Sequence, residues 1–260
     1  MLLSIVAIGC GRLGYDAQAA PDASPADTFP PTDTGDPDTT PTDPLLGYSS
    51  EFDGTPLHPD WRERGAPSHA MAEMIDGALV MIPSGPEEWR NSSRAALLFV
   101  LVEGDFAVET RVSVESMSMP GEPAVPSWRL AGLLARDPAG DTGMENHVLT
   151  VIGAAGSPLQ TEFKNTVMSS TTVEGEAFGD MLGTLRLCRV GGEVRVLTQP
   201  SDGSATHERT YTRTDLPPEL QVGIFVESWT NNPVDVIARF EYVRFWRPTS
   251  LASCSFGGSA

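Results

Sequence analysis

The sequence predicts an all-β fold, an antiparallel sandwich or barrel, preceded by a disordered linker. After residue 45, short segments of alternating apolar and polar residues are separated by Gly, Pro, Asp and Asn, and there is no convincing helical stretch of about ten residues or more. Of the 260 residues, 40% are apolar, so the chain has enough material to bury a core. About 200 residues are acceptable for one such domain.

The first residues match a bacterial export signal. Residues 2–9, LLSIVAIG, are too few to span a bilayer, which takes about 20 apolar residues, but they suit the core of a signal peptide. Ala7-Ile8-Gly9-Cys10 resembles a lipoprotein signal, although Ala7 stands where leucine is favoured. The resemblance implies that residues 1–9 are removed and that Cys10 carries lipid, with acyl chains such as palmitate.

Such lipid would anchor the chain in the cell envelope. Each buried methylene contributes about 0.8 kcal/mol, so two or three acyl chains hold a protein on a membrane. Gly11 follows the cysteine in place of aspartate, which implies the outer membrane of a Gram-negative bacterium, on its periplasmic or surface side. The alternative is an ordinary N-terminal strand or helix with a stray cysteine.

Residues 10–47 are predicted to be a linker. The stretch 16–44 is dominated by Asp, Pro and Thr and contains a single aromatic residue. Proline favours extended conformations and the aspartates repel one another, so this stretch is expected to be a semi-rigid spacer without a core.

The alternating segments beyond the linker are expected to be strands. In FAVETRVSV, Phe106, Val108, Val112 and Val114 alternate with polar or small residues, the period of a half-buried strand. Gly191-Gly192 predicts a two-residue hairpin. The expected strands cover 78–82, 106–114, 129–136, 147–153, 159–167, 184–190, 193–199, 220–228 and 235–246.

The formal net charge of −18 argues against nucleic acid as a partner. Phosphate binding needs clustered Lys and Arg, and an acidic field repels it.

The order of these segments resembles a known superfamily. The residues are EFDGTPLHPDWRERG, GDFAVETRVSV, AGLLARDP, TLRLCRVGGEVRVLTQPSDG, VGIFVESW and ARFEYVRFW. They resemble the concanavalin A-like lectin/glucanase superfamily, and within it bacterial secreted modules of the DUF1349 kind. The resemblance implies a jelly-roll sandwich over residues 48–248, with 249–260 as a C-terminal tail; in relatives the concave face often carries ligands.

No catalytic motif of these enzymes is found. Glycosidases of the superfamily often carry Glu-x-Asp-x-x-Glu on one strand, which projects two carboxylates onto the same face. The nearest candidate, Glu73 to Asp76, has a spacing that puts its carboxylates on opposite faces. Hydrolase elbows, phosphate loops and metal motifs are also missing, and the four histidines are dispersed. Carboxylates brought together from distant strands remain an alternative.

Three tryptophans are candidate sugar-binding residues, because a sugar stacks its C–H face on an exposed ring. Trp89, Trp128 and Trp229 stand beside loop signals, whereas Trp61 and Trp246 are expected to close the core. The alternative for each is burial. The charged residues Glu109, Arg111, Glu162, Lys164, Arg186 and Arg195 are expected to be solvated cross-strand neighbours.

One acidic loop is a candidate calcium site. Asp137, Asp141, Glu145 and Asn146 offer the hard oxygen ligands that calcium prefers, between two expected strands. The spacing is not that of an EF-hand, and an ordinary solvated turn is the alternative. No other cofactor is expected.

Cys188 and Cys254 are a candidate disulfide. Leu185 and Leu187 face inward on their expected strand, so Cys188 faces outward, toward a tail that could fold back. In an oxidising compartment the two thiols could pair, closing a loop of about 65 residues; otherwise Cys254 is free in a loose tail.

Together these features predict a cell-envelope lipoprotein that displays one lectin-like sandwich and binds glycan or another surface ligand without catalysis. The alternatives are a glycoside hydrolase or its accessory domain, and a structural or protein-interaction module with no small ligand.

Overall fold

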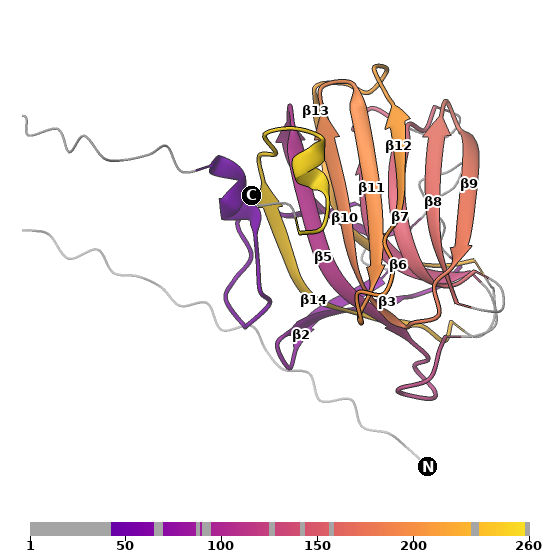
Figure 1. Cartoon of the computed structure of the whole chain (residues 1–260). Helices are drawn as coiled ribbons and strands as arrows, with labels where there is room; N and C mark the ends of the chain where they lie inside the picture. The colour runs from indigo at the N-terminus through magenta and orange to yellow at the C-terminus, as the bar shows by residue number, and fades with distance from the viewer. Residues whose placement is uncertain are drawn as a thin grey trace, which may run out of the picture. The chain divides into compact units, whose positions relative to one another are not determined.

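The alternating segments of the sequence form long strands in the computed structural model (Figure 1). The elements are η1 (Pro44–Tyr48), β1 (Arg62–Arg64), β2 (Ala70–Ile75), β3 (Ala78–Pro83), β4 (Leu97–Glu103), β5 (Phe106–Glu115), β6 (Arg129–Arg136), β7 (His147–Ala154), β8 (Gln160–Val167), β9 (Ser170–Ala177), β10 (Leu182–Val190), β11 (Glu193–Pro200), β12 (His207–Thr212), β13 (Glu219–Ser228), β14 (Ile237–Trp246) and η2 (Ala252–Cys254). Each of the nine expected strands is present, within two residues of its predicted ends.

The structure describes residues 43–64, 70–86, 89, 95–124, 128–140, 144–155, 159–229 and 234–257. The predicted signal peptide, Cys10 and most of the predicted linker lie outside these ranges. Within them, no helix is long and apolar enough to cross a bilayer.

The strands form two antiparallel seven-stranded sheets (Figure 1). The first sheet has the order β1-β4-β13-β6-β7-β8-β9, and the second has the order β12-β11-β10-β5-β14-β3-β2. The predicted hairpin is confirmed: β10 and β11 pair from Val190 and Glu193 outward, with Gly191 at φ +58°. A residue with a side chain adopts this φ only with strain, so the tight turn favours glycine.

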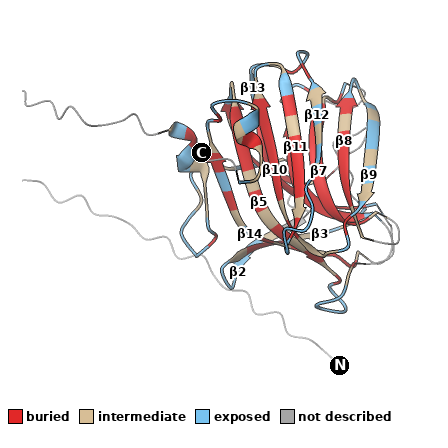
Figure 2. Ribbon diagram, viewed as in Figure 1, coloured by how far each residue is buried: buried red, intermediate tan, exposed pale blue. Residues whose placement is uncertain are grey.

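The core lies between the two sheets, and the middle strands carry many of its buried residues (Figure 2). Phe106, Val108, Val112 and Val114 of β5 point into it, as their alternation predicts. Burying one such side chain contributes about 1.5–3 kcal/mol, so the two apolar faces hold the sheets together. This is the jelly-roll β-sandwich that the sequence predicts.

Five of the observed strands were not predicted from the sequence, and their burial patterns and lengths explain why. Six of the seven residues of β4 are buried or half-buried, with both faces covered, so the strand is a continuous apolar run without alternation. β9 and β12 are polar edge strands whose burial patterns lack a fully buried residue, and β2 is also an edge. β1 has only three residues.

An ionic network joins the two sheets where edge strands β9 and β12 face each other. Arg209 donates from Nε to Glu174 Oε2 and from Nη2 to Glu176 Oε1, each at 2.6 Å, and its guanidinium lies over the ring of Phe163. The hydrogen bond between His207 and Glu176, followed by that from Arg209, lowers the pKa of the Glu176 carboxyl below its ordinary value. Charged polar groups therefore cover the core where the sandwich would otherwise be open.

Candidate functional site

Trp128 and Trp229 lie side by side at one end of the first sheet. Trp128 precedes β6 and Trp229 follows β13. In the antiparallel pairing of these strands Arg129 lies opposite Ser228, so the two residues just beyond this pair, Trp128 and Trp229, are also neighbours. The Trp229 backbone N–H donates to the Trp128 carbonyl oxygen at 2.9 Å. The ring centroids are 6.0 Å apart, the ring planes are inclined by 51°, and each residue is 46% exposed. We call these two residues the indole pair.

Trp128 adopts a strained backbone conformation. Its φ is +57°, in the left-handed region, which is uncommon for residues other than Gly, Asn and Asp and costs about 1–3 kcal/mol. A large apolar residue is thus both strained and half exposed. Strain of this kind clusters at functional sites, so the conformation favours a role for the ring in binding.

Trp89 does not join the indole pair, and of the two alternatives for this residue the structure shows burial. It is fully buried, with His147 and Phe225 packed edge-on against its ring and the Arg136 guanidinium 5.6 Å above it. The reason is a second apolar layer on the outer face of the first sheet, which a large ring must cover. Its members are Ala95, Leu97, Phe99, Leu130, Leu134, Leu149, Val151 and Phe225.

The other two tryptophans pack at the ends of the domain. Trp61 is partly buried against the core and donates from Nε1 to the Tyr48 carbonyl at 3.1 Å, as expected for a core closure. Trp246 is partly buried, but on the outer face of the second sheet beside Cys188 and Cys254 rather than in the main core.

Beside Trp89 lies a charge cluster that sequence reasoning missed: Lys164 of β8 with Glu162 of β8 and Glu227 of β13. The Lys164 ammonium is 2.5 Å from Glu227 Oε1 and 3.6 Å from Glu162 Oε2. Glu227 Oε2 accepts the Trp89 backbone N–H at 2.7 Å. All three charged side chains are at most 7% exposed. The expectation that Glu162 and Lys164 are solvated is therefore wrong, because both side chains are buried against their ionic partners.

This cluster brings two carboxylates together from distant strands, as the hydrolase alternative requires. In a glycosidase, the sugar's anomeric carbon and glycosidic oxygen must lie between the two carboxyl groups. Here the Lys164 ammonium contacts both groups and takes that space. The arrangement is suited to joining β8 and β13 across the two strands between them.

The neighbouring side chains of Arg136 and His147 also form hydrogen bonds with other side chains. Arg136 donates to Gln221 Oε1 at 2.6 Å and pairs with Glu145 Oε2 at 3.1 Å, and burial lowers the pKa of its guanidinium. Burial, aided by nearby cationic groups, lowers the pKa of His147 to about 3, so this ring is neutral near pH 7 and shares a hydrogen bond with Thr166.

The predicted calcium ligands do not converge where the structure describes them. Glu145 pairs with Arg136, Asn146 Oδ1 accepts from the Met168 backbone at 2.9 Å, and Asp137 Oδ1 accepts from the Ala139 backbone at 2.8 Å. Asp141 lies outside the described residues. Among the described residues, no group of three or more His, Cys, Asp or Glu side chains is arranged to hold a metal ion.

The two remaining cysteines meet on the outer face of the second sheet. Cys188 and Cys254 are both fully buried, in one cluster with Ala107. Burial, together with the contact to Cys254, raises the pKa of the Cys188 thiol. Both residues are thiols in this structure. The tail does fold back, and whether the pair oxidises stays a prediction.

Arg186 secures that tail. Its Nη1 donates to the carbonyls of Cys254 at 3.1 Å and Ser255 at 2.7 Å, and its guanidinium contacts the rings of both Trp246 and Phe256. It also pairs with Glu109. Arg186 is thus 9% exposed rather than solvated as expected, because the C-terminal segment covers it. Arg111 is half-exposed and pairs with Glu241 across strands, in agreement with the expectation.

Comparison with known proteins supports the fold. No protein-family model matches the chain, and no curated protein matches it in sequence. Solved structures do match. A protein of unknown function from Saccharomyces cerevisiae has a TM-score of 0.59 at 14% identity, covering 74% of this chain and 98% of its own.

Two further solved structures come from carbohydrate-active or carbohydrate-binding proteins. Xylan β-1,4-xylosidase from Bacillus halodurans C-125 has a TM-score of 0.59 at 16% identity; the match covers 77% of this chain but only 39% of the xylosidase. Lectin I-B4 from Griffonia simplicifolia, in its metal-free form, has a TM-score of 0.54 at 14% identity over 76% of this chain and 97% of the lectin. Identities this low establish the fold alone, and the fold is the lectin-type jelly-roll sandwich.

Proposed function

We propose that this protein binds carbohydrate through the indole pair, as a non-catalytic lectin-like domain held at the cell envelope by lipid on Cys10. The observation that carries the proposal is the pairing of Trp128 and Trp229, two half-exposed rings brought together from strands far apart in sequence. Exposed indoles offer the flat apolar surface on which the C–H face of a sugar stacks. The lectin-type fold is consistent with this use.

Substitution of the indole pair tests the binding site. A glycan array identifies a binding glycan, and calorimetry then measures its affinity for Trp229→Ala and Trp229→Phe. Loss of the indole is expected to weaken binding about tenfold or more, which corresponds to about 1.4 kcal/mol. The Phe variant keeps a ring and should retain part of the affinity. Met168→Ala, on the exposed β8–β9 turn, is the matched control and should bind normally.

Trp128→Gly separates function from stability. This change removes the ring and relieves the left-handed strain together, so binding should weaken while the melting temperature falls little. Equal affinity for all variants would place the site elsewhere, and hydrolysis of the bound glycan would refute the non-catalytic role. A wild-type protein that binds no glycan would instead favour a protein-interaction module.

The lipid anchor is tested separately. Cells expressing the full chain and fed a clickable fatty acid should label the wild type and the Cys254→Ser variant, and both should fractionate with the outer membrane. Cys10→Ser should abolish the label and release the protein from the membrane, because a chain without acyl groups lacks their buried methylenes. An unlabelled wild type would contradict this part of the proposal.

A further inference from the structure

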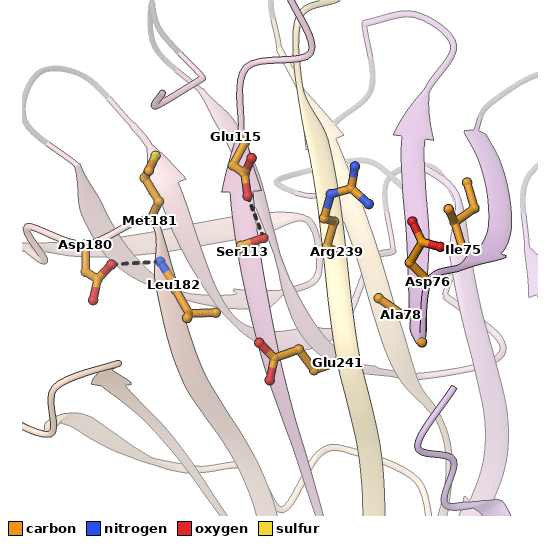
Figure 3. A pocket seen from close by; sticks show the side chains of 11 residues that line it. Ile75, Asp76, Ala78, Ser113, Glu115, Asp180, Met181, Leu182, Arg239 and Glu241 are labelled. Atoms are coloured by element: carbon orange, nitrogen blue, oxygen red, sulfur yellow. Dashed lines mark hydrogen bonds between the residues drawn. The ribbon is translucent and has the colours of Figure 1, made fainter. Parts of the chain in front are cut away.

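A pocket opens on the outer face of the second sheet (Figure 3), and neither residue of the indole pair lines it. Its walls are the β2–β3 turn with Ile75 and Asp76, the start of β10 with Leu182, and the strands β5 and β14 between them. Its volume is about 410 Å³. Pockets that hold small ligands measure about 300–1,000 Å³, so the space suffices for a small ligand.

Arg239 is the arginine among the residues that line this pocket. It lies on β14 between Ser113 of β5 and Val80 of β3. Its guanidinium makes no hydrogen bond or ion pair with any residue that the structure describes, and Figure 3 shows it directed into the open space. Arg244, on the same strand, instead forms two bonds to Glu51, at 2.7 and 2.9 Å. The five N–H donors of Arg239 are thus available to a ligand.

The surrounding carboxylates are oriented by other protein groups. Glu115 accepts from Ser113 Oγ and from the Gly121 backbone, each at 3.1 Å, and Glu241 pairs with Arg111 at 3.3 Å. An ionised carboxylate accepts about four hydrogen bonds, so these two groups keep free acceptor positions. The pocket therefore offers oriented carboxylate acceptors beside the guanidinium donors of Arg239.

The charges select the class of ligand. The pocket is lined by the carboxylates Asp76, Glu115, Asp180 and Glu241 against one guanidinium, in a chain of net charge −18, so an anion is repelled. A simple cation would be repelled by the positive charge of Arg239. A hydroxyl group suits both, because it donates to a carboxylate and accepts from the guanidinium at once. Ile75 and Leu182 add apolar surface for C–H groups.

We infer that this pocket binds a neutral saccharide, as a second site on the sheet opposite the indole pair. The inference extends the proposed function, because both sites would bind carbohydrate, but it stands on different residues. Two separate sites would let one domain contact two glycan chains, or one chain twice, with a gain in avidity.

Methionine NMR on the full chain tests this site independently of the indole pair. Met181 lines the pocket, whereas Met168 lies on the exposed β8–β9 turn. With ¹³C-methyl methionine, neutral xylohexaose, cellohexaose or mannohexaose is expected to shift the Met181 signal and leave Met168 unchanged. Arg239→Gln should raise the dissociation constant read from Met181 about tenfold or more, since it removes charge-assisted donors. Trp229→Ala should leave this constant unchanged.

Further variants and probes make each outcome decisive. Asp76→Asn, at an exposed turn residue with φ +53° that asparagine tolerates, should also weaken binding without affecting folding. Arg244→Gln is the control arginine and should bind normally. A Met181 shift caused only by hexagalacturonate would reveal an anion site and overturn the inference, and a shift caused only by a chitosan hexamer would reveal a cation site. No shift with any probe would overturn it too, while leaving the indole pair untouched.

Discussion

Lys164→Met is expected to lower the free energy of unfolding by about 3–5 kcal/mol, because it leaves two carboxylates buried without their shared cation. Glu227 and Glu162 are at most 7% exposed beside the Lys164 ammonium. Methionine keeps the length of the apolar stem, so the loss measures the charge rather than a cavity. Urea unfolding followed by far-UV circular dichroism gives the difference.

Two further variants identify the cause of that loss. Lys164→Met combined with Glu227→Gln should recover part of the stability, because the amide oxygen still accepts the Trp89 backbone N–H while the buried charge of Glu227 is gone. Arg244→Met breaks the solvent-exposed pair with Glu51 and should cost less than about 1 kcal/mol. A Lys164→Met loss no larger than that of Arg244→Met would show that the charge cluster contributes little to folding.

Oxidation of the cysteine pair is expected to stabilise the protein by about 4 kcal/mol. The two cysteines lie in one buried cluster of the folded structure, and a bridge would close a loop of about 65 residues, which reduces the entropy of the unfolded chain. Oxidised glutathione supplies the oxidant: two thiols form one disulfide and two molecules of reduced glutathione leave. Exchange should be slow, because both cysteines are fully buried and the oxidant reaches their sulfurs only when the C-terminal segment opens.

Mass spectrometry and thermal melting measure this bridge. After oxidation, alkylation under denaturing, non-reducing conditions should leave Cys188 and Cys254 unmodified, and the melting temperature should rise above that of the reduced protein. Cys254→Ser should show neither effect. Alkylation of both cysteines after full oxidation would show that the two thiols do not form the bridge.

The buried charge cluster and the indole pair lie on the same sheet but differ in their exposure to solvent. Glu227 lies in β13 and Trp229 follows the strand two residues later, yet Glu227 is buried and Trp229 is half exposed. The exposed rings therefore stand on a rigid support, since β13 is tied to β8 through Lys164 and to β6 by the antiparallel ladder. Binding surfaces on rigid elements lose little entropy when a ligand docks.

Local patterns in the sequence were enough to predict the strands that face the core on one side. Alternation in Phe106–Glu115 and the glycine pair between β10 and β11 each specify a structure within a few residues. The outward direction of Cys188 follows from the same period of two. Where both faces of a strand are covered, as in β4, or where the strand is a polar edge, as in β9, the period carries no signal.

The sequence by itself determined the sandwich class and indicated Trp128 and Trp229 as candidate binding residues. These two predictions depend only on short-range spacing and residue type. Only the tertiary structure decided that these two rings are neighbours, that Trp89 is buried, and that Lys164 joins Glu162 to Glu227. Those facts depend on the pairing of β6 with β13 and on the layer that covers the first sheet. Both are contacts between residues far apart in the chain, and local periodicity contains no information about such contacts.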